Sequence, residues 1–273
     1  MTGDEPIFTP AHLRKAGADD HREARLDEEA GRRADVNISA LNLDYRALNA
    51  QIRAAQGDVT VTDCCGQRFI GCGLAHKHLT LAGTPGNALG AYLDGAAITV
   101  HGNVQDAVAD TMNDGTLVVH GDAGDALGYA MRGGSILVRG NAGYRTGIHM
   151  KQYITKRPAI VVGGRAGSFL GEYLAGGVIV VLGLYSDSLP VADFTGTGMH
   201  GGQIFVRTNR DLPSLPAQVD VQHASAEDLQ EILPLLRRFS AHFGTDADQL
   251  MRDRFYVLRP NAQNPYKQLY VMN

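Results

Sequence analysis

The sequence predicts an all-β fold: a right-handed parallel β-helix of about seven coils, with an N-terminal capping helix and a C-terminal helical tail. Two observations predict it. From residue 79 to about residue 209 the chain aligns with itself in steps of about nineteen residues. Within each step, apolar residues and glycines return at fixed positions. Such a repeat forms one structural unit per copy, and stacking the copies buries a continuous core.

The copies differ in length but keep the same phase. Units of nineteen residues span 79–97, 98–116, 117–135 and 160–178, whereas 136–159 carries an insertion after Met150 and 179–203 is stretched. Residues 59–78 form a degenerate first coil, and a last copy begins at residue 204. Positions one and three, such as Ile98 and Val100, are nearly always Ile, Leu or Val, and both point to one interior because alternate strand residues share a face. The unequal segments within each coil favour the right-handed form.

Glycines mark the corners of each coil. The fifth position holds Gly83, Gly102, Gly121, Gly140, Gly164 and Gly183. A glycine directly after every strand indicates a corner that needs positive φ or a close approach of two backbones. A second glycine position is replaced once by Ala109, and Met112, Met131 and Met150 belong to a third interior column.

The chain divides into three parts. Residues 1–40 form a charged N-terminal arm, 41–209 the β-helix with its cap, and 210–273 a helical tail and closing strand packed on the β-helix. The cap is a helix from about residue 41, started by Asn42 or Asp44 and ended by Gly57. It covers the open end of the stack.

The tail carries its own boundary signals. Ser225 to Asp228 is a capping box that opens an amphipathic helix, which Gly244 ends. Pro234 lies inside this helix and is expected to kink or split it. A second short helix follows Thr245, and residues 255–260 form a final strand.

Composition excludes several classes of function. The net charge of -4 gives no reason to expect nucleic acid or an anionic membrane as partner. The three cysteines are few, odd in number and clustered, which fits reduced thiols in a cytoplasmic protein. The N-terminus lacks an apolar signal core, and the apolar runs are too short to span a bilayer.

Position two of the coils faces outward yet becomes apolar along the chain. The column consists of Val118, Leu137, Val161, Val180 and Phe205. An exposed column of this size needs a cover, either another part of the chain or a partner subunit. We predict a partner interface here, together with the basic residues Lys151, Lys156 and Arg157 of the first insertion.

Two insertions interrupt the repeats, at 147–158 and 184–198. They are expected between the same corners, so that both loops lie on one side of the solenoid, where repeat proteins often bind. The basic first loop would meet an acidic partner or a polyglutamate-bearing carrier. An ordinary tolerated insertion is the alternative.

Candidate ligands are sparse, and we expect no catalytic, cofactor or metal site in this chain. His101 and His120 share one repeat position and should stack on an outer face, with Arg139 next, but two histidines make a poor zinc site. Cys64, Cys65 and Cys72, with His76 and His78, form the most metal-like group; their spacing fits no standard zinc motif. The glycine pattern at 121–128 opens no helix, so dinucleotide binding is not expected.

These repeats resemble a known family. The segment GDAGDALGYAMRGGSILVRGNAGYRTG (121–147) resembles the GXGXG domain at the C-terminal end of the large chain of glutamate synthase. It resembles more closely the β-helical subunit of formylmethanofuran dehydrogenase. The tail at 226–251 and the strand at 255–260 are similar to the segment that follows the β-helix in glutamate synthase. The resemblance covers residues 59 to about 270.

The resemblance implies a non-catalytic scaffold subunit. Glutamate synthase carries an amidotransferase domain and a flavin barrel, for which 273 residues leave no room. A β-helical protein of this size belongs in methylotrophic bacteria to a formyltransferase/hydrolase complex, in which formyl-tetrahydromethanopterin passes its formyl group to a methanofuran-type carrier that is hydrolysed to formate. Its implied partners are amidohydrolase-like, formyltransferase and dehydrogenase-like subunits, with the metal in another subunit. Three alternatives remain: the β-helical subunit of an archaeal-type formylmethanofuran dehydrogenase, a glutamate-synthase-like protein in an amidotransferase complex, and a β-helical acyltransferase.

Overall fold

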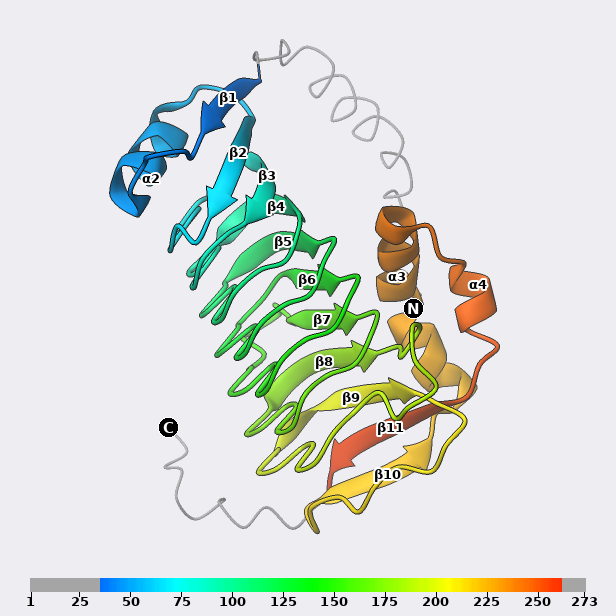
Figure 1. The fold of residues 1–273 in the computed structure, drawn as a ribbon. Helices are drawn as coiled ribbons and strands as arrows, with labels where there is room; N and C mark the ends of the chain where they lie inside the picture. Colours follow the sequence, from blue (N-terminus) through cyan, green and yellow to red (C-terminus); the bar gives the residue numbers. More distant parts are fainter. Residues whose placement is uncertain (1–34, 262–273) are drawn as a thin grey trace, which may run out of the picture. The chain divides into compact units, whose positions relative to one another are not determined.

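The computed structural model describes residues 35–261, which build one 11-stranded sheet (Figure 1). Its first nine strands follow chain order and pair in parallel, so eight turns of the chain join them into a β-solenoid. The predicted parallel β-helix is confirmed, with about eight turns where about seven were expected. Most of the predicted arm, residues 1–34, and the end of the predicted tail, 262–273, lie outside the described residues.

The elements have these bounds. The parallel strands are β1 (Val36–Ser39), β2 (Val59–Cys65), β3 (His78–Thr84), β4 (Asp94–His101), β5 (Asp114–Val119), β6 (Ser135–Val138), β7 (Ala159–Val162), β8 (Ala175–Val181) and β9 (Gly201–Arg207). The remaining elements are helices α2 (Tyr45–Ala54), α3 (Ala226–Phe243) and α4 (Ala247–Leu250), and strands β10 (Val219–His223) and β11 (Phe255–Pro260).

The register of the sheet equals the alignment of the repeats. Position one of each coil pairs with position one of the next, as Leu79 with Ile98 and Ile160 with Ile179. Positions one and three are buried in a single core along the solenoid, together with the Met and Leu column that includes Met112. Both interior columns are thus confirmed. The register that buries them is strongly specified, because a slip of one residue would move the interior side chains of a strand to its outer face.

The first coil begins earlier than predicted. β1 pairs in parallel with β2, so the sheet starts at Val36, within the segment predicted as an arm. Only Ile38 of this four-residue strand is buried, which leaves too short a pattern to read from the sequence. Asp44, one of the two predicted caps, is the N-cap of α2, but the helix ends at Ala54, before Gly57.

Helix α2 closes the solenoid through specific hydrogen bonds. The buried Asn49 accepts a bond from the backbone N–H of Gly71 (3.0 Å), a group that in the next coil, at Gly90, bonds to the preceding coil instead. The Lys77 ammonium donates to two carbonyls at the C-terminal end of α2, those of Ile52 and Ala55, both at 2.7 Å. Asn49 therefore pairs a backbone group that a preceding coil would otherwise pair, and Lys77 satisfies the last carbonyls of α2.

The corner glycines exist because successive coils approach closely. A Cβ on Gly121 would overlap Oδ1 of Asn103, and one on Gly140 would overlap Oδ1 of Asp122. Those oxygens accept the backbone N–H groups of the next coil, Asp122 N–H at 2.9 Å and Asn141 N–H at 2.6 Å. This ladder of Asx side chains links coil to coil. Its residues looked only like polar turn residues in the sequence.

Two separate reasons thus maintain glycine in this fold. At the fifth position only Gly83 and Gly183 have a left-handed φ, of 105° and 59°, so close approach rather than φ explains the others. The second glycine position is left-handed throughout, as at Gly128 (φ 68°), and Ala109 adopts the same conformation (φ 58°) where it replaces glycine.

The C-terminal part closes the other end of the sheet. β11, at the predicted residues, lies antiparallel between β9 and β10, and β10 was not predicted. Ser225 and Asp228 form the capping box of α3, and Gly244 ends it in the left-handed conformation. The predicted split at Pro234 is wrong: α3 runs through it, because its buried face fixes the helix on the sheet. None of the helices in residues 35–261 has the length and apolarity that crossing a lipid bilayer requires.

A pair of variants separates the two reasons for glycine. Gly102→Ala introduces a Cβ that overlaps the carbonyl oxygen of Gly83, at a φ outside the left-handed region. Gly66→Ala keeps a left-handed φ of 78° but has open space for its Cβ. We expect urea unfolding to show a loss of roughly 2–3 kcal/mol or more for Gly102→Ala and about 1 kcal/mol for Gly66→Ala. Equal losses would contradict the close-approach explanation.

Candidate functional site

The outward apolar column is buried within the chain. Its members are Val118, Leu137, Val161, Val180 and Phe205, each at most 1% exposed. They pack in one cluster with the apolar face of α3, formed by Ile232, Leu236 and Phe239. The prediction of a partner interface at these five residues is therefore wrong. The alternative is correct, because the amphipathic helix of the tail and the apolar column bury each other.

A glycine reveals how closely α3 approaches the sheet. Position four of the coils holds His101, His120 and Arg139, but Gly163 stands there in the next coil. A Cβ on Gly163 would lie 2.8 Å from Cζ of Phe239. It would also overlap the carbonyl oxygen of Arg139, so the preceding coil and the helix above together exclude a side chain here. In the sequence, position four changes from large side chains to glycine at Gly163, and this change was the signal that could have shown where the helix approaches the sheet.

The first insertion is a hairpin whose basic residues bind within the chain. Tyr153 and Lys156 form an isolated antiparallel bridge. The Lys156 ammonium lies 3.0 Å from Asp114 Oδ2, and the hydrogen bond between them raises the pKa of Lys156 and lowers that of Asp114. Arg157 forms an ion pair with Glu231 of α3 and donates to Gln203 Oε1 at 2.7 Å. Two of the three predicted interface cations therefore hold the base of the hairpin.

The tip of the hairpin is apolar and exposed. Tyr153 is 54% exposed and Ile154 is 76% exposed, beside the exposed Lys151. The basic character of this loop was visible in the sequence, whereas the outward position of these two apolar side chains was not. Whether a partner meets Lys151, Lys156 and Arg157 stays a prediction.

The second insertion starts at a different corner of the coil from the first. The first begins after Met150 of the interior column, and the second follows Gly183 of the corner after the strand. The expectation that both loops lie at the same phase is therefore wrong. Both lengthen a turn, but the repeat alignment places them on opposite halves of the coil.

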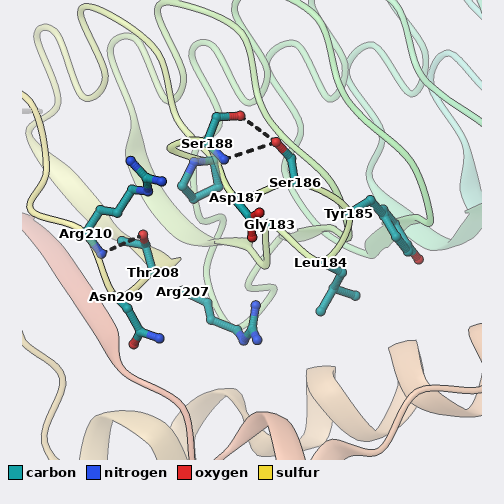
Figure 2. Close-up of a pocket in the computed structure, with 11 residues that line it drawn as sticks. Gly183, Leu184, Tyr185, Ser186, Asp187, Ser188, Arg207, Thr208, Asn209 and Arg210 are labelled. Atoms are coloured by element: carbon teal, nitrogen blue, oxygen red, sulfur yellow. Dashed lines mark hydrogen bonds between the residues drawn. The ribbon is translucent and has the colours of Figure 1, made fainter.

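A polar hollow of about 640 Å³ lies at the second insertion (Figure 2). It is lined by residues 183–188, Pro190 and residues 207–210. Ser186 and Ser188 bond to each other, and the Arg207 guanidinium is bound by Asp253 Oδ2 (2.6 Å) and the Leu182 carbonyl (2.8 Å). These hydroxyl and guanidinium groups already bind partners within the chain, so they do not make the hollow a built ligand site.

The histidine column is confirmed and lies beside the end of α3. The rings of His101 and His120 are 4.6 Å apart, and His120 contacts Phe243 edge-on at 5.2 Å. Burial, followed by the nearby His101, His242 and Arg139, lowers the pKa of His120. A charge on His120 is thus unfavourable where α3 meets the sheet.

The cysteine group does not form a metal site in the structure. Cys64 is buried, Cys65 is exposed and Cys72 is half-buried. Burial, with the nearby Asp63, raises the pKa of Cys64 to about 11, so its thiol stays protonated at neutral pH. Within residues 35–261, no three His, Cys, Asp or Glu side chains are grouped so that they could hold a metal ion.

Comparisons with known proteins agree with this architecture. The model of the GXGXG motif family matches residues 39–261, which include the solenoid from the end of β1 and the closing elements α3, α4 and β11. An uncharacterized protein of Methanocaldococcus jannaschii is 38% identical over 251 residues, covering 86% of this chain and 96% of that protein. Its name states no activity.

Truncation of the covered column should destabilise the isolated chain. We expect Leu137→Ala to lower the free energy of unfolding by about 2–5 kcal/mol, because it leaves a cavity between the sheet and α3. Leu41→Ala, at a side chain that is 66% exposed, is the matched control and should change stability by less than about 0.5 kcal/mol. Urea unfolding of the purified chain measures both. Similar small effects would contradict the helix cover.

Stability should fall at mildly acidic pH because of His120. Its pKa is lowered in the folded state, so the unfolded chain takes up the proton first as pH falls below the ordinary histidine value of about 6.5. The contribution is complete above that pH and is lost below it, by at most about 1.4 kcal/mol per pH unit. Urea midpoints at pH 7.5 and 5.5 should differ more for the natural chain than for His120→Gln. An equal difference in both would contradict this role.

Proposed function

The chain belongs to the GXGXG motif family, and from this premise we propose that it is a scaffold subunit of a multi-subunit enzyme. The complex we propose is a formyltransferase/hydrolase. In such a complex a formyl group passes from tetrahydromethanopterin to a methanofuran-type carrier and leaves as formate. Amidohydrolase-like, formyltransferase and dehydrogenase-like subunits perform the chemistry, with the metal in one of them. The resemblance of residues 121–147 to the β-helical subunit of formylmethanofuran dehydrogenase supports this assignment.

The observation that carries the scaffold proposal is the exposed tip of the first insertion. Tyr153 and Ile154 are held outward on a hairpin whose base is fixed by Lys156 to β5 and by Arg157 to α3. Tyrosine is enriched among the residues that contribute most to binding at protein interfaces, and a loop that is already fixed loses less conformational entropy when a partner binds. Ion pairs to two separate elements thus position a small apolar anchor for a partner protein.

The solenoid that carries this anchor has the rigidity that a spacer between two enzymes needs. Each coil bonds to the next through parallel strands and through Asx side chains at the corner, as between Asn103 and Asp122. Surfaces on different coils therefore keep fixed separations. Two enzymes held at a fixed distance raise the effective concentration of a tethered carrier that moves between their sites.

A glutamate-synthase-like role is the second candidate. The elements α3, α4 and β11 close the solenoid with the order of segments that the sequence shares with the region after the β-helix in glutamate synthase. This observation favours a complex with a glutamine amidotransferase and a flavin-binding synthase subunit. The scaffold role is the same in both assemblies, and only the partners differ.

Purification from the natural source tests the proposal. We expect the tagged chain to elute well above its own mass of 29.2 kDa, together with partner chains that mass spectrometry identifies. Formyltransferase and amidohydrolase-like chains would support the first assembly, and amidotransferase and flavoprotein chains the second. Elution of the chain alone would overturn the scaffold proposal.

The hairpin tip can be tested in the same preparation. The double variant Tyr153→Ser, Ile154→Ser should weaken partner binding by at least about 2 kcal/mol, roughly thirty-fold, as expected for two interface anchors. Tyr185→Ser is the matched control, since Tyr185 is 57% exposed on the other insertion. Titration of the purified partner measures both affinities. Unchanged binding by the double variant would remove the hairpin from the interface.

A further inference from the structure

Aromatic rings gather on one side of the solenoid, on the turn segment at positions nine to fourteen of the coils. We call the outward columns at positions nine, ten, thirteen and fourteen the turn face. Its rings are Phe69, Tyr92, Tyr129, Tyr144, His149, Phe169, Tyr173 and Phe194. Several remain largely uncovered within the described part of the chain, including Tyr92 (54% exposed), Tyr144 (55%) and Phe194 (55%). The turn face is thus an exposed aromatic surface on a rigid support.

The rings are ordered along the columns. Phe169 and Phe194 stack at 4.8 Å between ring centroids, and His149 stacks on Tyr173 at 5.0 Å. Tyr129 meets His149 edge-on at 5.8 Å. Side chains that already hold one another lose little conformational entropy when a partner binds.

The backbone conformation of the turn face gives a second reason to assign a use to its large side chains. Tyr92, Phe169 and Phe194 all have left-handed φ, of 56°, 63° and 60°. Other coils use Gly73 and Gly198 at position fourteen, where Tyr92 stands. A left-handed side chain costs roughly 1–2 kcal/mol, so glycine would be the less strained choice. Ala107 and Thr111 share this left-handed φ, so the strain belongs to the turn, and it is the presence of large rings where small residues also occur that points to a use of their surface.

The charges of the turn face define what fits it. Its carboxylates are Asp106, Asp110, Asp125, Glu172 and Asp193. Among the described residues of these four columns, Arg68 and Arg145 are the two basic residues, against five carboxylates. A surface of aromatic rings with interspersed carboxylates attracts guanidinium and ammonium groups through cation–π contacts and ion pairs together.

The chain itself shows this mode of binding. The Arg145 guanidinium carbon lies 5.0 Å from the centroid of the Phe169 ring, and Arg145 Nε lies 3.0 Å from Glu172 Oε2. One arginine is therefore held by a ring and a carboxylate of the next coil at the same time. The other rings and carboxylates of the turn face repeat these components.

We propose that the turn face docks a second protein subunit through arginine and lysine side chains that insert between its rings and carboxylates. The inference rests on the proposed scaffold function and adds a partner chemistry to it. A scaffold that holds two enzymes needs two separate docking surfaces, and the hairpin tip at Tyr153 and Ile154 supplies the other. The acidic surplus disfavours both a nucleic acid and a second copy of this same face, since like charges would oppose each other.

Site-specific photo-crosslinking in the purified complex tests this proposal. Benzoylphenylalanine replaces Tyr92 or Tyr129 on the turn face, and Leu41 or Tyr185 as exposed control positions. We expect crosslinks from Tyr92 and Tyr129 to one other polypeptide, at a peptide that contains arginine or lysine, and none to that peptide from the controls. Crosslinks to a second copy of the chain, or none while the complex is intact, would overturn the turn-face proposal and leave the scaffold proposal standing.

A charge reversal gives an independent measurement on the same complex. Asp110→Lys should weaken binding of the crosslinked partner at least about tenfold, and added salt should weaken binding by the natural chain. Asp187→Lys, in the second insertion, is the matched control and should bind normally. Equal affinities for both variants would overturn the proposal. A chain that purifies alone, with no crosslinks from any position, would overturn the scaffold function as well.

Discussion

The close approach of successive coils is the constraint on which the rest of this structure depends. Parallel strands in register fix the spacing between coils at about 4.8 Å. At the corners that spacing leaves no room for a Cβ, because the Asx side chain of the preceding coil occupies the position and accepts the next backbone N–H, as Asn103 does from Asp122. The corner glycines, the interior aliphatic columns and the Asx ladder are therefore three consequences of the distance between successive coils.

The same spacing decides where function can lie. Position-one and position-three side chains fill the interior from β1 to β9, so ligands and partners meet the outside of the coils. One outer side is occupied by α3 on the apolar column. The turn face and the hairpin tip remain, and both present aromatic or apolar groups that contacts within the chain already order. Repetition thus turns single exposed residues into surfaces with a fixed geometry.

Charge acts locally in this molecule. The net charge of -4 does not show where charges interact. Lys156 and Arg157 each bind a carboxylate of a different element, and His120 lies where a positive charge is unfavourable. The basic insertion looked like a surface for an acidic partner. In the structure two of its charges, on Lys156 and Arg157, hold the loop, and this holds the apolar residues Tyr153 and Ile154 outward.

The sequence by itself determined the coil, its register and its caps, because these depend on contacts that repeat every nineteen residues or lie within one turn of helix. The pairing of Leu79 with Ile98 and the caps at Asp44, Ser225 and Gly244 could all be read in this way. Tertiary structure alone decided which distant segments meet. The cover of Val161 by α3, the pairing of Arg157 with Glu231 and the insertion of β11 between β9 and β10 join residues far apart in the chain. The pattern of one segment shows that it has an apolar or charged face, but it does not show which other face will bury or neutralise it.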